Sequence, residues 1–189
     1  MDPNIWGPYT WYYVHLVTYS MPDDPLEFAK KKKYYIQFFS LLGYLLPCNK
    51  CRYHYNNAIK KPMIIEKCAT KNATIDWMID YHNYVDEHFA EMPFYGPVTR
   101  QEADLLYMFD NKPYINHQKL NVFPNIVLNN VMYAQKCKQF LDIISHIHPC
   151  ILCRSSLFLE IHIKNSYKFT KILHFTNISK PIRNITCDH

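Results

Sequence analysis

Glycine is scarce in this chain: its 189 residues include only three glycines, against sixteen tyrosines and eleven phenylalanines. Tight hairpin turns depend on residues that tolerate positive φ, above all Gly and the Asn-Gly pair, and the sequence contains no Asn-Gly pair. Hydrophobic residues make up 49% of the chain, which excludes a disordered or low-complexity protein. We therefore expect rigid, aromatic-rich packing rather than a loop-rich fold.

Apolar residues recur near the helical period through most of the first 110 residues. Pro is favoured in the first turn of a helix, and a Thr followed three residues later by Glu has the spacing of a capping box. The predicted helices cover residues 5–20, residues 26–46, a short segment that starts after Pro47, residues 76–90, and a segment from Thr99 to about Asp110.

The rest of the chain has a weaker pattern, which is mostly helical at residues 121–147. The sequence thus predicts an all-α protein with one domain at residues 1–110 and a mainly helical module at residues 111–189. The net charge of +5 lies in residues 97–189, because residues 1–96 hold 10 Lys and Arg against 10 Asp and Glu. A solvated basic surface is the simpler interpretation, and an acidic partner, a phosphate or a membrane surface is the alternative.

The sequence favours a soluble, non-secreted protein. Met1 is followed by Asp, Pro and Asn rather than by a basic stretch and an apolar core. The longest apolar run, residues 34–46, is too short to span a bilayer, so no membrane span is expected. Seven cysteines are many for such a protein. In a reducing compartment they point to redox chemistry or metal binding before structural bridges.

Cys48 and Cys51 are separated by two residues and follow a Pro. At this spacing the sulfurs can close a small disulfide ring within the first turn of a helix, where the helix dipole and exposed N–H groups stabilise a thiolate. Lys50 and Arg52 add positive charge. The same spacing is common in zinc sites, so spacing alone does not separate a redox pair from half of a zinc site.

Trp and His residues around the cysteine pair favour a flat ring system over a metal. Trp11 and His15 stand four apart on one face of the first predicted helix. His82 and Asn83 follow the cysteines and come shortly after Trp77. Trp and His faces can sandwich a heteroaromatic ring, while Asn and His provide hydrogen bonds to its edge. Each residue alone is more often core packing, but together and in this order they suit a flavin.

Three motifs in this order resemble the signature of the Erv/ALR sulfhydryl oxidases, and most closely the short single-module enzymes of large cytoplasmic DNA viruses. They are Trp11-X3-His15, Phe38-X3-Leu42-X4-Pro47-Cys48-X2-Cys51 and Trp77-X4-His82-Asn83-X-Val85. The resemblance covers roughly residues 5–110. It implies a four-helix bundle with a short fifth helix, which holds FAD between its helices and places the isoalloxazine ring against the cysteine pair.

The resemblance also implies roles for individual residues. Cys51 corresponds to the sulfur next to the flavin, and Cys48 to the sulfur that exchanges with substrate thiols. Asp86 departs from the Asn usual at its position and lacks the amide donor, and Ile79 replaces a frequent structural cysteine. The residues at positions expected to contact FAD are Trp11, His15, Tyr55, His82, Asn83, Val85 and Asp86.

The same resemblance implies a FAD-dependent thiol oxidase that forms disulfide bonds in thiol-containing protein substrates. Electrons would pass from substrate thiols through Cys48 and Cys51 to FAD and then to O2, which yields H2O2. No metal and no nucleic-acid partner is expected. The resemblance further implies a homodimer through the first two helices, or an internal pseudo-dimer in which residues 111–189 replace that contact. The expected location is the cytoplasm of an infected host cell, with the virion as a second location.

A second stretch of sequence is similar to the cysteine region. Residues 140–154 match residues 38–52 at a constant offset of 102 positions, with Phe, Pro, Cys-X-X-Cys and Arg recurring. Trp11 and Trp77 have no counterpart at this offset. The second part is therefore either a degenerate copy that has lost its FAD contacts, or a segment that converged on the same local pattern.

Several roles stay open for the second cysteine pair, Cys150 and Cys153. A shuttle disulfide that passes electrons to Cys48, or a structural disulfide, is favoured over a zinc site completed by Cys137, His146 or His148. For the whole chain, the alternative is a zinc-binding interaction protein in which both pairs form one four-thiolate site. A thioredoxin-like reductase is disfavoured, because no alternation of strands and helices flanks the first pair. No role is assigned to Cys68, Cys137 or Cys187.

Overall fold

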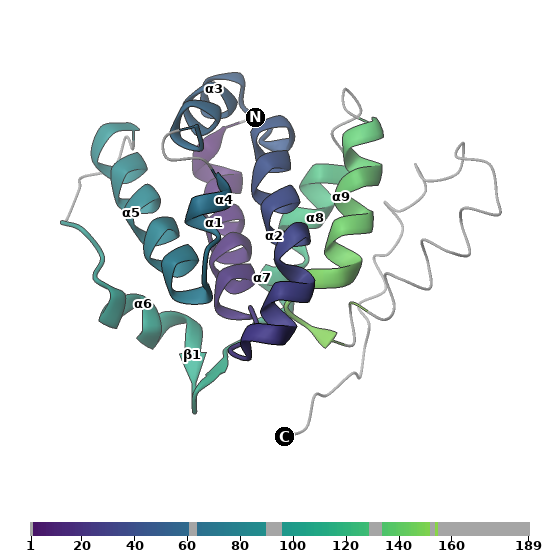
Figure 1. Ribbon diagram of the computed structural model, residues 1–189. Coiled ribbons are helices and arrows are strands. Elements are labelled where there is room, and N and C mark those ends of the chain that lie inside the picture. Colours follow the sequence, from purple (N-terminus) through teal and green to yellow (C-terminus); the bar gives the residue numbers. More distant parts are fainter. Residues whose placement is uncertain (1, 61–63, 90–95, 129–133, 152–153, 155–189) are drawn as a thin grey trace.

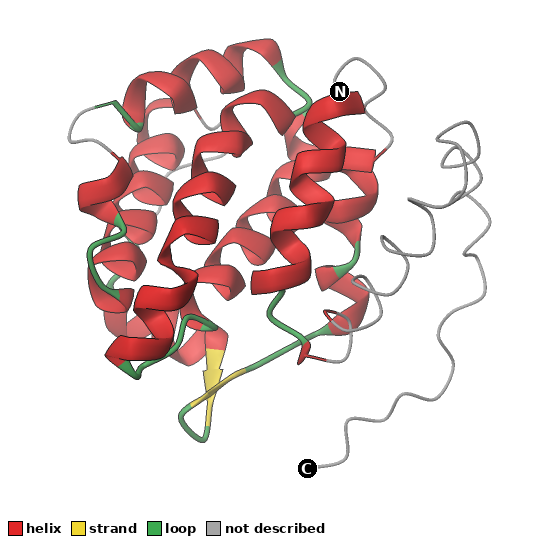
Figure 2. Cartoon of the chain, turned by 45° about the vertical axis from the view of Figure 1, so that its right-hand side comes forward, coloured by secondary structure: helices red, strands yellow, loops and turns green. Residues whose placement is uncertain are grey.

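The computed structural model describes residues 2–60, 64–89, 96–128, 134–151 and 154. The predicted all-α class is confirmed, because helices dominate these ranges and one small hairpin is the exception within them (Figures 1 and 2). The helices are α1 (Pro3–Tyr19), α2 (Pro25–Leu45), α3 (Asn49–Ala58), α4 (Ile64–Lys67), α5 (Lys71–Phe89), α6 (Arg100–Tyr107), α7 (His117–Leu120), α8 (Val122–Leu128) and α9 (Ala134–Ile147).

Capping residues explain where the main helices begin. The Asp2 carboxylate accepts a backbone N–H of α1 at 2.9 Å, and the Asp24 carboxylate accepts one of α2 at 2.8 Å. Thr99 and Glu102 form the predicted capping box at the start of α6. The start of α5 lies before the predicted residue 76, because the Thr70 hydroxyl accepts a backbone N–H of its first turn at 3.1 Å.

The end of α6 differs from the sequence prediction. The helix expected to reach Asp110 stops at Tyr107, and the chain forms the antiparallel strands β1 (Met108–Phe109) and β2 (Lys112–Pro113). Asp110 and Asn111 form the turn between them with φ values of 47° and 60°. Asp and Asn tolerate this left-handed region better than other residues with a Cβ. An Asp-Asn pair therefore does here what an Asn-Gly pair does in most tight hairpins.

The largest core joins both parts of the chain. Tyr13 of α1, Phe38 of α2, Phe123 of α8 and Phe140 of α9 are all fully buried. The ring centroids of Tyr13 and Phe123 lie 5.2 Å apart, and those of Phe123 and Phe140 lie 5.8 Å apart. Figure 1 shows α1 and α2 in the middle of the molecule, with α5 on one side and α8 and α9 on the other. Burial of each such ring stabilises the fold by about 1.5–3 kcal/mol.

Close contacts place α3 on the carboxyl-terminal half of α2. The Tyr55 hydroxyl donates to the backbone carbonyl of Phe39 at 2.8 Å. The Asn56 amide donates to the carbonyl of Gly43 at 3.0 Å, and a Cβ on Gly43 would overlap the Asn56 side chain. The lack of a side chain at position 43 thus allows α3, and with it the cysteine pair, to approach α2. No described helix combines the length and apolarity that crossing a membrane requires.

Candidate functional site

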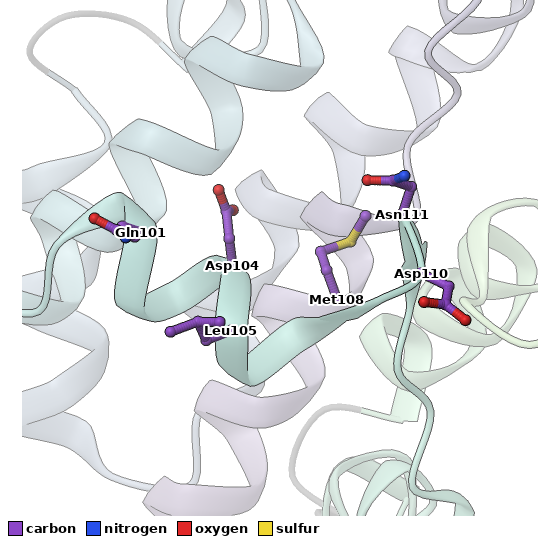
Figure 3. Close-up of a pocket in the computed structure, with 6 residues that line it drawn as sticks. All are labelled: Gln101, Asp104, Leu105, Met108, Asp110 and Asn111. Atoms are coloured by element: carbon purple, nitrogen blue, oxygen red, sulfur yellow. The ribbon is translucent and has the colours of Figure 1, made fainter.

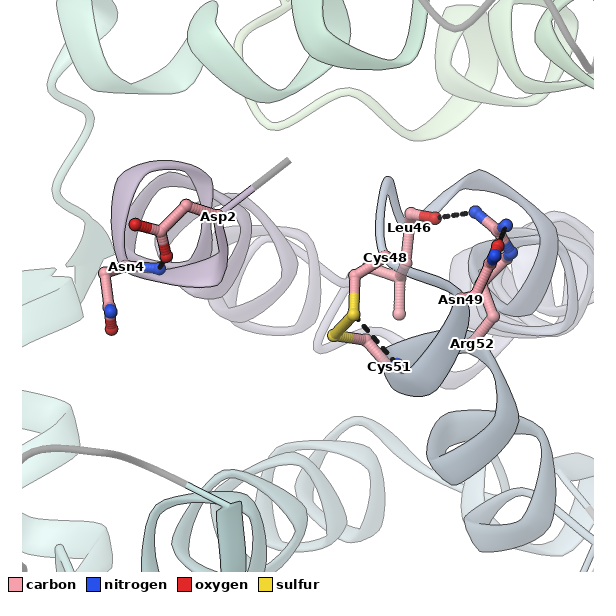
Figure 4. The surroundings of a disulfide bond; sticks show 7 residues. All are labelled: Asp2, Asn4, Leu46, Cys48, Asn49, Cys51 and Arg52. Atoms are coloured by element: carbon pink, nitrogen blue, oxygen red, sulfur yellow. Dashed lines mark hydrogen bonds between the residues drawn. A yellow bond between two sulfur atoms is a disulfide. The ribbon is translucent and has the colours of Figure 1, made fainter.

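Cys48 and Cys51 form a disulfide at the start of α3, with their Cα atoms 5.2 Å apart (Figure 4). Cys48 is the N-cap of this helix, and its Sγ accepts a hydrogen bond from the backbone N–H of Cys51 at 3.1 Å. Both residues are partly exposed, which leaves the bond open to an attacking thiol. The positive end of the helix dipole at this position stabilises a thiolate that forms when the bond opens.

Arg52 ties the first turn of α3 to the end of α2. Its guanidinium donates to the backbone carbonyl of Leu46 at 2.5 Å and contacts the side-chain oxygen of Asn49 (Figure 4). Its backbone N–H donates to the carbonyl of Cys48 at 3.0 Å. Arg52 therefore binds the carbonyls of Leu46 and Cys48, on either side of Pro47, and these two bonds fix the orientation of Cys48.

Rings from three helices form a cluster at the contact of α1, α5 and α6. Trp11 of α1 stacks on His82 of α5, with centroids 3.9 Å apart and planes 18° apart. His15 Nε2 lies 3.0 Å from His82 Nδ1, so one nitrogen donates a hydrogen bond to the other. The His15 ring also stacks on Tyr107 of α6 at 4.8 Å. The two histidines predicted from widely separated motifs thus contact each other directly.

Both histidines of this cluster are neutral at pH 7. Burial, with a smaller effect of the neighbouring His82, lowers the pKa of His15 to about 3. Burial lowers the pKa of His82 to about 4. His82 Nε2 lies 3.6 Å from a carboxylate oxygen of Asp86, which is too far for a good hydrogen bond. Because the imidazole is neutral, this contact is not an ion pair. Burial raises the pKa of Asp86.

The other predicted cofactor residues occupy the same side of the bundle with different roles. The Asn83 side chain pairs twice with the backbone of Val98, donating to its carbonyl and accepting its N–H, each at 2.9 Å. This pairing attaches α5 to the segment before α6. Val85 is half-buried on α5, and Tyr55 is buried with its hydroxyl bound to the α2 backbone.

Tyr81 links the cysteine helix to the ring cluster and was not predicted from the sequence. Its ring centroid lies 5.9 Å from that of Trp11 and 5.4 Å from that of Tyr55 on α3. Its position directly before His82 could have marked it as a residue of the site. Tyr107 and Val98 were also missed; the contact of Tyr107 with His15 and that of Val98 with Asn83 depend on tertiary packing, so no local sequence pattern marks them.

The ring cluster fits a flat heteroaromatic cofactor. The indole and the neutral imidazoles offer ring faces for stacking. His15 Nδ1 is a buried polar atom with no hydrogen-bond partner among the described residues, so a cofactor atom can satisfy it. Trp11 and His82 stack on each other, so insertion of a ring between them requires the two rings to separate.

The remaining cysteines are only partly covered by the structure. Cys150 is buried at 4% exposure, and Cys153 and Cys187 lie outside the described residues. Cys68 and Cys137 are buried, and burial raises the pKa of both thiols. Among the residues that the structure describes, no three His, Cys, Asp or Glu side chains gather in a group that could hold a metal ion.

A shallow pocket lies at the opposite end of the molecule from α3, beside α6 and β1 (Figures 1 and 3). Its Asp104 carboxylate is already bound by the Tyr19 hydroxyl at 2.8 Å and the Arg100 guanidinium at 2.9 Å. None of the predicted cofactor residues line it, so it is separate from the candidate site. Its lining residues are Gln101, Asp104, Leu105, Met108, Asp110 and Asn111.

The fold and site define a class: all-helical proteins with a Cys-X-X-Cys disulfide at a helix start and a cluster of imidazole and aromatic rings between the helices. The family model described as Erv1 / Alr family matches residues 8–102, which is half of the chain. The chain therefore belongs to the Erv1/Alr family.

Two viral relatives agree with this assignment. A probable FAD-linked sulfhydryl oxidase, R368 of Acanthamoeba polyphaga mimivirus, is 38% identical over 46% of this chain and 59% of its own length. A putative FAD-linked sulfhydryl oxidase, 347L of Invertebrate iridescent virus 6, is 32% identical over 54% of this chain and 95% of its own length. The match thus spans less than two thirds of the mimivirus relative. No solved structure matches the chain significantly.

Proposed function

We propose that this chain is a FAD-linked sulfhydryl oxidase that forms disulfide bonds in thiol-containing protein substrates and passes the electrons to dioxygen. The observation that carries the proposal is the partly exposed Cys48–Cys51 disulfide at the start of α3. The ring cluster of α1 and α5 supports it, as do family membership and the names of both viral relatives.

The cysteine pair carries out the first half of the reaction by thiol–disulfide exchange. A substrate thiolate attacks Cys48 Sγ, which forms a mixed disulfide and releases Cys51 as a thiolate. The second substrate thiol then attacks the substrate sulfur of the mixed disulfide, so the substrate leaves with a disulfide and Cys48 is reduced. The N–H of Cys51, which donates to Cys48 Sγ at 3.1 Å, stabilises the Cys48 thiolate as it leaves.

Re-oxidation requires a two-electron acceptor beside Cys51. When bound, FAD would supply this acceptor, and dioxygen would take up the two electrons to give hydrogen peroxide. The residues proposed to hold FAD are Trp11, His15, Tyr55, His82, Asn83, Val85 and Asp86. These residues have different roles in this chain. Trp11, His15 and His82 offer ring faces, and the buried Nδ1 of His15 can bind a cofactor atom. Asn83 holds the backbone of Val98 in place.

The rest of the proposal concerns partners and location. Self-association takes one of two forms, a homodimer or an internal pseudo-dimer formed by the second part of the chain. Because both relatives are viral, we place the activity in the cytoplasm of an infected cell, with the virion as a second location. Cys150 and Cys153 stay a proposed shuttle pair; the burial of Cys150 means that exchange with a protein thiol requires its turn to open.

Oxygen consumption by a Cys51→Ser variant tests the proposal. The wild-type protein should be yellow, with flavin absorbance, and should consume oxygen when it receives dithiothreitol or a reduced protein. The variant should keep FAD but lose both activities, because no thiolate remains to be re-oxidised beside the flavin. Near-normal oxygen consumption would remove Cys51 from the mechanism. A colourless wild-type protein with stoichiometric zinc would support the zinc-binding alternative instead.

A further inference from the structure

The helices α2 and α9 pack against each other more extensively than any other pair in the described ranges, and Figure 1 shows them side by side. Tyr34 of α2 stacks on His146 of α9 with centroids 4.1 Å apart. Lys136 of α9 lies over the ring of Tyr44 of α2, with Nζ 4.7 Å from the centroid. The start of α2 contacts the end of α9, and the end of α2 contacts the start of α9, so the two helices run antiparallel.

These contacts are reciprocal under the sequence offset of 102 positions. Tyr34 corresponds to Lys136, and Tyr44 corresponds to His146. The contact between positions 34 and 146 therefore has its mirror in the contact between 44 and 136. Near the middle of the pair, Phe38 meets its own counterpart Phe140, with centroids 6.2 Å apart. Such reciprocity, with a residue touching its own equivalent, is the property of an interface with two-fold symmetry.

The chain after each helix repeats the same hydrogen bonds. The carbonyl of Leu46 accepts the Arg52 guanidinium, and the carbonyl of His148, its counterpart, accepts the Arg154 guanidinium at 2.7 Å. The backbone N–H of Arg52 binds the Cys48 carbonyl at 3.0 Å. The N–H of Arg154 likewise binds the Cys150 carbonyl at 2.9 Å. The two turns therefore share the same local backbone and Arg geometry.

The two copies differ in accessibility. Cys48 is partly exposed, whereas Cys150 is buried. The ring cluster has no equivalent beside α9 in the described residues, and the position that matches Trp11 is Pro113. The first copy therefore retains a reactive centre, while the described part of the second contributes packing surface.

We propose that α9 and the turn at Cys150 are an internal copy of α2 and the turn at Cys48, which pairs with the original about a local two-fold axis. The copy covers, within one chain, the face of α2 that carries Tyr34, Phe38 and Tyr44. The full chain is therefore a monomer. This inference rests on the packing of α2 and does not depend on thiol oxidation.

Photo-crosslinking combined with light scattering tests the inference on the full chain. Tyr44 is 47% exposed, so Tyr44→benzoylphenylalanine leaves the core intact. We expect a mass near 22.7 kDa at all concentrations up to about 100 µM. The crosslink should lie within one chain and join position 44 to a peptide of α9. A dimer in which position 44 crosslinks to α2 of another molecule would overturn the inference.

A matched pair of substitutions on α9 extends the test. Phe140→Asp places a charge against Phe38 and should displace α9, so the exposed face of α2 should pair with a second molecule and double the mass. Gln139→Asp adds the same charge at an exposed position of the same helix and should stay monomeric. A folded, monomeric Phe140→Asp variant would contradict the proposal. If this variant does not fold, the crosslink from position 44 in the otherwise native chain still shows whether α2 pairs with α9 of the same chain or with a second molecule.

Discussion

At the scale of single residues, the burial of His15 and His82 makes the site sensitive to acid. Both folded pKa values, about 3 and about 4, lie below the ordinary value of 6.5. Between about pH 4 and 6.5 the unfolded chain therefore binds more protons than the folded chain, and the free energy of unfolding falls as the pH falls through this window. The stabilisation is fully present above pH 6.5.

The pH prediction is measured as a difference between proteins. For His82 alone, the lowered pKa corresponds to a loss of at most about 3 kcal/mol between pH 7 and pH 4. Urea unfolding at several pH values should show this loss in the wild type and a flatter profile in the His15→Gln/His82→Gln double variant. His148 is also buried and contributes its own pH dependence to both proteins. The quantity to compare is therefore the difference between the two profiles. Parallel profiles would contradict the prediction.

Cofactor retention gives a second prediction at this scale. Trp11→Ala and His82→Ala each remove one ring of the stacked pair, so purified variants should lose flavin absorbance. At FAD concentrations 100-fold above the wild-type Kd, the lost ligand stabilisation amounts to about 2.7 kcal/mol. His88→Ala removes an exposed ring from the same helix and should stay yellow. A yellow, equally stable His82→Ala variant would assign that ring to core packing alone.

At the scale of elements, the contact between α2 and α3 sets the position of the cysteine pair. Two short backbone-directed bonds, from Tyr55 and Asn56, attach α3 to α2. Arg52 closes the connection between the two helices. The local sequence predicts both helices, but the close approach depends on a residue without a Cβ, Gly43, facing a residue in the next helix.

A double-mutant cycle measures the coupling energy between Gly43 and Asn56. Ala favours a helix over Gly by about 1 kcal/mol, yet Gly43→Ala alone should stabilise nothing, because Asn56 must move and loses its bond to the α2 carbonyl. In an Asn56→Ala background the same change should raise the free energy of unfolding by up to about 1 kcal/mol. The expected coupling energy is therefore about 1 kcal/mol, and additive effects would show that the helices do not touch at this point.

At the scale of the whole molecule, one core unites segments that the sequence analysis treated as two parts. Phe123 and Phe140 from the second part pack on Tyr13 and Phe38 from the first. Replacement of such a ring by Ala costs about 3–5 kcal/mol, so the second part contributes substantially to the stability of the first. The predicted boundary at residue 110 marks a change in sequence character, and the packing continues across it.

The second cysteine pair gives the prediction for the whole chain. The double variant Cys150→Ser/Cys153→Ser should retain activity on dithiothreitol and lose most activity on a reduced protein if the pair is a shuttle. The structural alternative, in which the buried Cys150 holds the turn, predicts that both activities fall together with stability. Oxygen consumption on both substrates and a melting curve separate the two roles. Unchanged activity on both substrates would end the shuttle hypothesis.

The sequence by itself predicted α1, α2, α3, α5 and α6 and a cysteine pair that can close a disulfide, whereas α4 and α7 were not predicted. These features are encoded by residues a few positions apart: apolar periodicity, capping side chains, and two sulfurs separated by two residues. The hairpin at Asp110 and Asn111 was missed because its turn residues are not the commonest ones. The order of the motifs also predicted the correct family and predicted that Trp11, His15 and His82 belong to one site.

Only the tertiary structure decided which of these residues touch. The hydrogen bond between His15 and His82 joins positions 67 apart in sequence, and the contacts of Tyr81 and Tyr107 depend on the packing of α5 and α6. The pairing of α2 with α9 likewise depends on how two similar helices bury their apolar faces together. Such contacts arise from the free energy of excluding water over the whole core, which no local pattern of residues records.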